Sequence, residues 1–130
     1  MAAPDLAARA KGRTVSAGLL QDLPCLAYDE ELALIGAFFA AVFGVPAALR
    51  PAATAPDLRI LLGMAEAGMG WTVLPDYLCA EALAAGRLAA LPTDPAGPII
   101  TLYLAWTRAS LREVRTVHAR DALLRRFGTA

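Results

Sequence analysis

The sequence predicts an α/β domain with a mostly parallel sheet and helices on both of its faces. Short apolar runs alternate with amphipathic helical stretches along the 130 residues, which indicates βαβ units with right-handed crossovers. The stretch 57–79 is typical of a helix, a tight turn and a buried strand. Residues 99–106 are apolar almost throughout, as in a central strand that is covered on both faces.

The stretch 57–79 is the best-defined part of the sequence. Asp57 follows a proline and is placed to accept hydrogen bonds from the first free N–H groups of a helix. One face of that helix is apolar, formed by Leu58, Leu61, Leu62 and Ala65. Gly68 should end the helix, because glycine accepts the left-handed conformation. Gly70 then allows a tight turn into a buried strand at 71–74.

Residues 1–22 are the least regular segment. We expect one short helix at 6–11. Gly12 and Gly18 should break regular structure in the rest of the segment, because glycine destabilises the interiors of helices and strands.

Residues 23–97 hold most of the alternation of strands and helices. Strands are expected at 24–28, 49–54, 71–74 and 87–91, and helices at 29–43, 57–67 and 76–85. The first of these helices begins at three acids, which suit the positive end of a helix. Its wide apolar stripe consists of Leu32, Ile35, Phe38, Phe39, Val42 and Phe43.

Residues 98–130 are predicted to form a returning strand at 99–106 and a last helix at 111–127. The predicted buried positions of that helix are Val114, Val117, Leu124 and Phe127. From residue 108 onward there are six arginines and two acids. A nucleic-acid-binding face is one interpretation. We favour a solvated face, because no aromatic residues interleave with the arginines as stacking platforms.

Composition excludes several classes of protein. Twelve basic and twelve acidic residues give a net charge of zero, which argues against nucleic-acid binding by the chain as a whole. Cys25 and Cys79 are expected to be buried free thiols in a reducing cytoplasm. The uncharged stretch 32–49 is not expected to span a membrane, since glycine and proline leave about 14 helical residues, or ~21 Å, against a core of ~30 Å.

No catalytic or metal-binding set emerges from the sequence. His118 is the only histidine, and one histidine does not build a familiar metal site. Gly68 and Gly70 follow a helix and precede a strand, the reverse of the dinucleotide-binding order. We therefore expect no enzymatic activity, no metal and no cofactor. A small α/β enzyme remains an alternative, which would require a pocket with convergent titratable groups.

Several short blocks occur in an informative order. They are Pro24-Cys25-Leu26-Ala27-Tyr28, then Ala-Gly-x-Gly-x-x-Val-Leu-Pro at 67–75, Gly86-Arg87-Leu88, and Leu102-Tyr103-Leu104-Ala105-Trp106. In this order, over roughly residues 23 to 127, the chain resembles the effector-binding domain of LysR-type transcriptional regulators.

The resemblance implies a periplasmic-binding-protein-like fold of type 2, in which two α/β subdomains clasp a small molecule. In such regulators a winged helix-turn-helix and a linker helix precede these subdomains. The chain is similar to a carboxy-terminal fragment of one. Residues 23–97 would be the second subdomain, and residues 98–130 the returning strand and helix of an incomplete first subdomain.

The implied function is the small-molecule effector-binding portion of a cytoplasmic regulator that lacks its DNA-binding domain and contacts neither DNA nor membrane. The alternative is a stand-alone solute-binding or dimerisation module, which forms mixed oligomers with full-length regulators. An unpaired strand at 99–106 would expose apolar surface and free backbone groups. We therefore expect homo-oligomers or pairing with a related regulator.

Ligands of open α/β sheets bind beyond the carboxyl ends of the strands. The residues predicted there are Tyr28, Asp29, Thr54, Ala55, Pro75 and Asp76. Each pair precedes a helix, so free N–H groups would favour a carboxylate effector, and Tyr28 and Thr54 would donate hydrogen bonds. For Asp29 and Asp76 we favour helix capping over ligand contact. Because the other wall of the cleft is absent, we expect weak binding.

Overall fold

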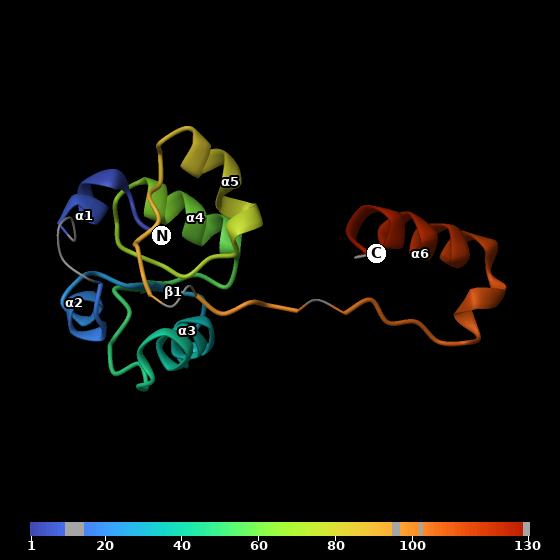
Figure 1. Ribbon diagram of the computed structural model, residues 1–130, viewed down its shortest axis with the longest axis horizontal. Helices are drawn as coiled ribbons and strands as arrows, with labels where there is room; N and C mark the ends of the chain where they lie inside the picture. The colour runs from blue at the N-terminus through green and yellow to red at the C-terminus, as the bar shows by residue number, and fades with distance from the viewer. Residues whose placement is uncertain (10–14, 95–96, 102, 129–130) are drawn as a thin grey trace. The chain divides into compact units, whose positions relative to one another are not determined.

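The computed structural model describes residues 1–9, 15–94, 97–101 and 103–128. These residues divide into two units, Met1–Ile99 and Ile100–Ala130. The first unit contains α1 (Pro4–Ala8), α2 (Ala17–Gln21), β1 (Leu26–Ala27), α3 (Ala33–Phe43), β2 (Ala53–Thr54), α4 (Leu58–Glu66) and α5 (Asp76–Ala84) (Figure 1). The second contains the short 3-10 helix η1 (Ser110–Arg112) and α6 (Val114–Phe127).

A parallel sheet organises the first unit. Strands β1 and β2 pair in parallel, with Leu26 opposite Ala53. On the other side of β1, the Leu26 N–H donates to the Trp71 carbonyl at 2.8 Å, and the Trp71 N–H donates to the Pro24 carbonyl at 2.9 Å. The segment around Trp71 is therefore a third parallel member of the sheet.

The amino-terminal residues extend this sheet. Met1 and Thr72 exchange two backbone hydrogen bonds of 2.9 Å. Ala2 then pairs with Ala89 in the antiparallel sense, through hydrogen bonds of 3.0 and 2.8 Å. The sheet thus joins segments from both ends of the first unit.

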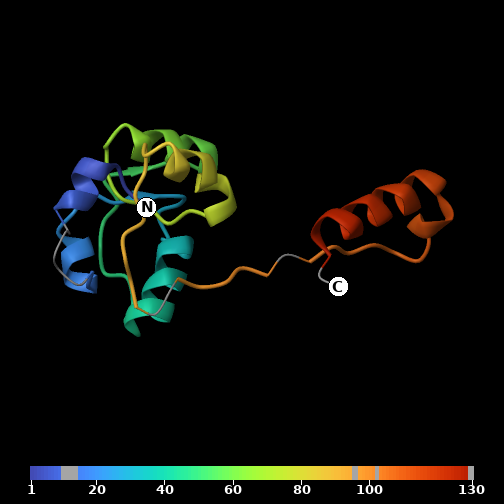
Figure 2. The same ribbon diagram turned by 45° about the horizontal axis from the view of Figure 1, so that its top comes forward.

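Two apolar clusters pack in this unit, one with α1, α2 and α3 and the other with α4 and α5. The first includes Leu20, Ile35, Phe39 and Trp71. The second includes Leu26, Leu61, Ala65 and Cys79. Figures 1 and 2 show α2 and α3 on one side of β1, and α4 on the other. The predicted fold class, a parallel α/β sheet with helices on both faces, is confirmed.

Helices α4 and α5 form close to the predicted positions, and α3 ends where predicted. The prediction that three acids open α3 is wrong, because α3 begins at Ala33 and has no acid in its first turn. The Asp57 side chain accepts a hydrogen bond from the Arg59 N–H at 2.8 Å, as the capping prediction requires. Gly44 and Gly68 follow α3 and α4 with φ of 66° and 75°. This left-handed conformation ends each helix at low cost only because glycine lacks a Cβ atom.

The two cysteines are free and buried, as predicted. Burial raises the pKa of the Cys25 thiol to about 12. Within the described residues, no helix is long and apolar enough to cross a membrane. The uncharged stretch at 32–49 contains α3, which has only 11 residues.

The amino-terminal segment is more regular than predicted. The first helix, α1, begins two residues before the helix that was predicted at 6–11. Gly12 lies outside the described residues. The prediction that Gly18 breaks the chain is wrong, because Gly18 lies inside α2. The Ser16 hydroxyl caps this helix by accepting from the Leu19 N–H at 3.3 Å. That cap and the burial of two leucines outweigh a glycine penalty of about 1 kcal/mol.

The predicted strands are mostly shorter in the structure. Of 49–54 only β2 forms, and the strands at 71–74 and 87–91 are reduced to single bridges at Trp71 and Ala89. The strand predicted at 99–106 is wrong for the residues described there. Ile99 and Tyr103 are 94% and 88% exposed. A strand needs a neighbouring backbone to pair with, and β-propensity does not supply one.

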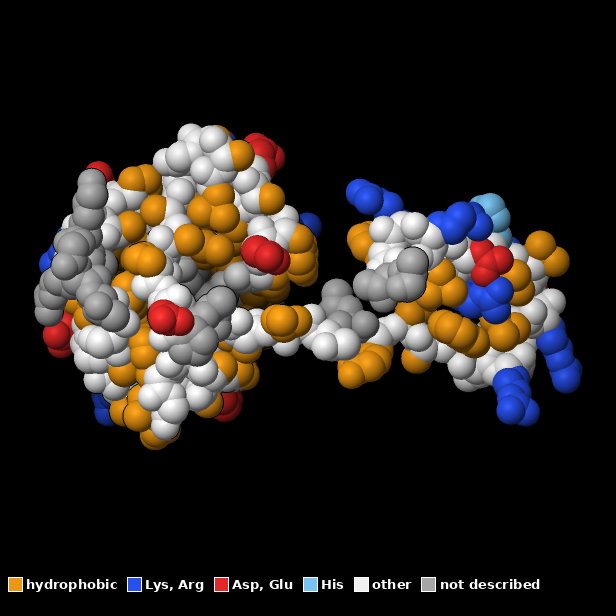
Figure 3. Space-filling view, viewed as in Figure 1, with side chains coloured by type: hydrophobic (Ala, Val, Ile, Leu, Met, Phe, Trp, Pro, Cys, Tyr) orange, Lys and Arg blue, Asp and Glu red, His pale blue; other side chains and the backbone are white. Residues whose placement is uncertain are grey.

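Helix α6 forms, but its predicted buried face does not. Val114 and Phe127 are 82% and 76% exposed, and no described α6 residue is buried. The apolar spacing predicts an amphipathic helix, whereas burial also needs an opposing surface. Figure 3 shows exposed apolar side chains and arginines together on the second unit. Within this unit the Arg120 guanidinium lies 5.7 Å from the centre of the Trp106 ring.

Candidate functional site

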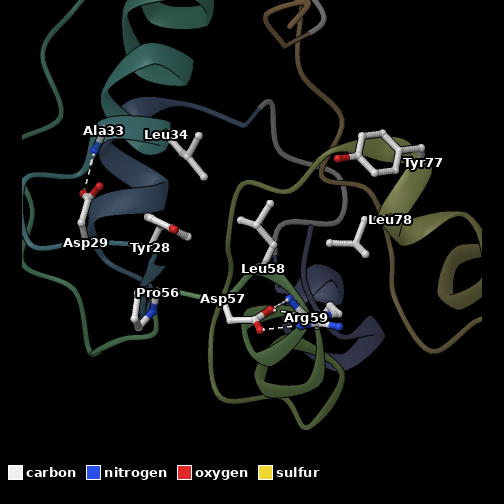
Figure 4. A pocket seen from close by; sticks show the side chains of 10 residues that line it. All are labelled: Tyr28, Asp29, Ala33, Leu34, Pro56, Asp57, Leu58, Arg59, Tyr77 and Leu78. Carbon is white, nitrogen blue, oxygen red and sulfur yellow. Dashed lines mark hydrogen bonds and ion pairs between the residues drawn. The ribbon is translucent and has the colours of Figure 1, made fainter. Parts of the chain in front are cut away.

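A hollow of about 550 Å³ opens beside the carboxyl ends of β1 and β2. Three segments build it: the loop from β1 to α3, the loop from β2 into α4, and the start of α5. Its lining consists of Tyr28, Asp29, Ala33, Leu34, Pro56, Asp57, Leu58, Arg59, Tyr77 and Leu78 (Figure 4). This is the edge of the sheet at which ligands of α/β proteins bind.

The hollow includes some of the residues predicted from the sequence and omits others. Tyr28 and Asp29 line it. The other four predicted residues, Thr54, Ala55, Pro75 and Asp76, are not among its lining residues. Ala55 is turned into the sheet, where it is 6% exposed and its N–H donates to the Ala27 carbonyl at 3.0 Å.

The hollow is lined instead by residues that lie one to five positions after these four predicted residues. After β2 these are Pro56, Asp57, Leu58 and Arg59, and at the start of α5 they are Tyr77 and Leu78. The predicted site residues lie in pairs at the carboxyl ends of the strands. The walls come instead mainly from the loops and first helical turns that follow. The signal that was missed is the Asp-x-Arg spacing at 57–59.

The chain's own carboxylates occupy the helix ends around the hollow. Asp29 Oδ1 accepts from the Ala33 N–H at 2.9 Å. Asp57 caps α4 as described above, and Asp76 Oδ1 accepts from the Tyr77 N–H at 2.8 Å. The capping prediction for Asp29 and Asp76 is wrong in detail, because the N-cap residues of α3 and α5 are Leu32 and Pro75 and neither helix has a side-chain cap. Each aspartate instead accepts from one nearby N–H group. One N–H group at each of these three helix starts is therefore already bonded to a carboxylate.

Arg59 and Asp57 form a two-point ion pair in the wall. Arg59 Nε donates to Asp57 Oδ1 at 3.3 Å, and Nη2 donates to Oδ2 at 3.0 Å. The side-chain hydrogen bond from Arg59 lowers the pKa of Asp57, and Asp57 raises the pKa of Arg59. Both groups stay charged at neutral pH. Because the pair is exposed to solvent, it orients the guanidinium more than it stabilises the fold.

Two tyrosines supply aromatic surface on opposite sides of the hollow. Tyr28 is 39% exposed and Tyr77 is 71% exposed. In Figure 4, Leu58 lies between them, Leu78 lies next to Tyr77, and the Tyr77 hydroxyl faces the space in the middle. An apolar lining with a few polar groups is typical of small-molecule sites. Among the described residues, no group of three His, Cys, Asp or Glu side chains is placed to hold a metal ion.

Comparison with known proteins assigns the chain to a family. The sequence profile of the LysR substrate binding domain matches residues 1–128. The chain belongs to this family. It is 36% identical to the HTH-type transcriptional regulator AbaB of Streptomyces antibioticus, over 133 aligned residues that cover 100% of this chain and 44% of AbaB. The chain thus spans less than half the length of that relative.

A solved structure supports the same assignment. The C-terminal domains of a LysR family protein from Agrobacterium tumefaciens str. C58 match with a TM-score of 0.63 and 31% identity. The match covers 75% of this chain and 46% of that one. The resemblance seen in the sequence is therefore confirmed, and so is the periplasmic-binding-protein-like fold. The chain is a LysR-type substrate-binding domain, which is a component of transcriptional regulators.

Proposed function

We propose that this chain is the effector-binding part of a LysR-type transcriptional regulator, and that a small molecule binds in the hollow lined by Tyr28, Arg59 and Tyr77. The observation that carries the proposal is the hollow itself. Its volume of about 550 Å³ lies within the ~300–1,000 Å³ typical of small-molecule sites. It also lies at the carboxyl edge of a parallel sheet, in a chain whose relative AbaB is a transcriptional regulator.

The domain boundaries follow from the same proposal. We assign residues 23–97 to the second effector-binding subdomain, and residues 98–130 to the returning strand and helix of the first. The division of the described residues at Ile99 supports this boundary. Effector binding would change the angle between two subdomains in a cytoplasmic regulator. Such a change requires an effector that binds one arrangement more tightly than the other.

One observation favours the alternative, a module that pairs with full-length regulators. Large apolar side chains of the second unit are exposed, among them Tyr103, Val114 and Phe127. Exposed apolar surface of this kind marks interaction sites. Co-purification of the chain with a full-length relative would support this function, and a clean monomer under the same conditions would exclude it.

The effector proposal is tested by thermal denaturation of the 130-residue chain with a library of small aromatic and aliphatic acids, amines and alcohols. A ligand that binds only the folded state stabilises it by RT ln(1 + [L]/Kd), about 2.7 kcal/mol when [L] is 100 Kd. We expect at least one compound to raise Tm. The rise should be smaller in Tyr77→Ala, which removes one aromatic wall.

Tyr103→Ala is the matched control, because Tyr103 is an exposed tyrosine of the other unit. This variant should keep the full rise in Tm. The proposal fails if no compound raises Tm, or if Tyr77→Ala responds as the unmodified chain does.

A further inference from the structure

We infer that the hollow takes a planar aromatic effector that carries a protonated amine, in preference to one that carries a carboxylate. The inference rests on the proposed function of the same site, and it adds the chemical class of the ligand. Three features of the lining support it: the state of the helix ends, the balance of charge, and the position of the two tyrosines.

Two helix starts beside the hollow already have a carboxylate next to them. A helix amino terminus attracts anions because its first N–H groups lack partners. Here Asp29 accepts from Ala33 at the start of α3, and Asp57 accepts from Arg59 at the start of α4. An incoming carboxylate would have to displace these side chains, or approach them as a like charge.

The charge of the lining points to a cationic ligand. Its charged residues are Asp29, Asp57 and Arg59, which sum to a formal charge of −1. Arg59 is the one cation among them, and both carboxylate oxygens of Asp57 hold it. Asp29 is not paired with any cation among the described residues, so its carboxylate is available to accept a hydrogen bond from an ammonium group.

The tyrosines favour an aromatic ligand with a positive charge. Tyr28 and Tyr77 line opposite sides of the hollow and are both exposed in it (Figure 4). Aromatic rings pair in offset-stacked or edge-to-face arrangements. The Tyr77 hydroxyl faces the space in the middle, and a phenol oxygen can accept a hydrogen bond from an ammonium group. Leu58 and Leu78 provide an apolar contact for the ring of the ligand.

Two matched probes test the ligand class on the 130-residue chain. 2-Phenylethylamine and 3-phenylpropanoate have the same ring and similar chains, but opposite charges at neutral pH. Binding is followed by NMR titration of the backbone amides of Ala33, Arg59 and Tyr77. We expect the amine to bind at least about fivefold more tightly than the carboxylate, as one charge-assisted hydrogen bond at a partly exposed site allows.

Asp29→Asn is the decisive variant. It removes the charge but keeps an oxygen that can accept from the Ala33 N–H, so this hydrogen bond at the start of α3 should remain. We expect the preference for the amine to fall by about fivefold. Glu30→Gln is the matched control, because it removes a charge from the adjacent exposed position, which does not line the hollow. Its preference should stay unchanged.

The outcomes separate the two proposals. If the carboxylate shifts the pocket amides at the same or lower concentration, the hollow binds small molecules but the inferred class is wrong. If neither probe shifts these amides, the effector site itself is overturned. If Glu30→Gln weakens amine binding as much as Asp29→Asn does, the attraction is general surface charge, and the inference is again wrong.

Discussion

At the scale of single residues, close contacts in the sheet leave little freedom for substitution. Gly70 lies where the turn after α4 enters the sheet beside β1. A Cβ atom built there would lie 2.6 Å from the Pro24 carbonyl oxygen and 3.0 Å from Leu26 Cγ. The sequence motif Gly-x-Gly thus has a steric reason at its second glycine, where the backbones of two sheet segments approach each other.

We predict that Gly70→Ala lowers the free energy of unfolding by about 2 kcal/mol or more, because backbone atoms must shift to admit the methyl group. Gly63→Ala is the control. Gly63 lies in α4 with open space around it, so alanine there should be neutral or stabilise by up to about 1 kcal/mol. Urea denaturation of the two variants would measure both effects. Equal stabilities would contradict the steric explanation.

The amino group of Met1 is a second constraint at this scale. It donates to the Thr72 carbonyl at 2.9 Å inside the sheet. Burial lowers its pKa from 8.0 to about 6. Between these values the unfolded chain binds more protons than the folded chain does. Stability therefore rises with pH across this range, because the cost of burying a charged amine disappears above it.

We predict that the free energy of unfolding of the 130-residue chain increases by about 2 kcal/mol from pH 6 to pH 8. The measurement is chemical denaturation at a series of pH values. His118→Gln should be used as the background, because it removes the chain's only imidazole. If the free energy of unfolding of that variant does not change with pH, burial does not lower the pKa of the Met1 amino group, and the prediction is wrong.

At the scale of elements, Trp71 connects the sheet to two helices. Its Nε1 donates to the Leu20 carbonyl at the end of α2 at 2.9 Å, and its ring stacks on Phe39 of α3 with centroids 6.2 Å apart. Trp71 itself is 1% exposed. A single buried side chain therefore holds α2 and α3 against the same face of the sheet.

We predict that Trp71→Phe destabilises the fold by about 2–4 kcal/mol, since it leaves a cavity and removes the indole hydrogen bond to the Leu20 carbonyl. Trp106→Phe provides the comparison, because Trp106 is 44% exposed and its loss should change stability by no more than about 0.5 kcal/mol. Thermal and urea unfolding would distinguish them. Similar losses in both variants would refute the assigned role of Trp71.

At the scale of the whole molecule, the two units differ in how they use their apolar residues. The first unit buries many of its large side chains in the two clusters, although some, such as Ile60 and Tyr77, are exposed. Among the described residues of the second unit, the large apolar side chains stay partly or fully exposed, including Ile100 at 59% and Tyr103 at 88%. Exposed β-forming residues without a partner strand are a known route to association.

We predict that the purified chain self-associates through the exposed apolar residues around Tyr103. Size-exclusion chromatography with light scattering would measure this. Tyr103→Lys should shift the chain toward the monomer, because a charged side chain opposes edge pairing. Ile60→Lys is the control, as Ile60 is 54% exposed on α4 of the first unit. A monodisperse monomer for the unmodified chain would rule the prediction out.

The sequence alone determined the family, the alternation of strands and helices, the positions of α4 and α5, and the end of α3. Helices are predictable in this way because their hydrogen bonds, caps and terminal glycines lie within a few residues of one another. It also determined the edge of the sheet at which Tyr28 and Asp29 lie.

Only the tertiary structure decided the short lengths of the strands, the exposure of α6, and the meeting of Arg59 and Tyr77 with Tyr28 in one hollow. A strand requires a partner backbone that is distant in the sequence, and an amphipathic face is buried only where another surface meets it. The lining of the hollow likewise comes from three segments that the sheet brings together, a proximity that no local pattern records.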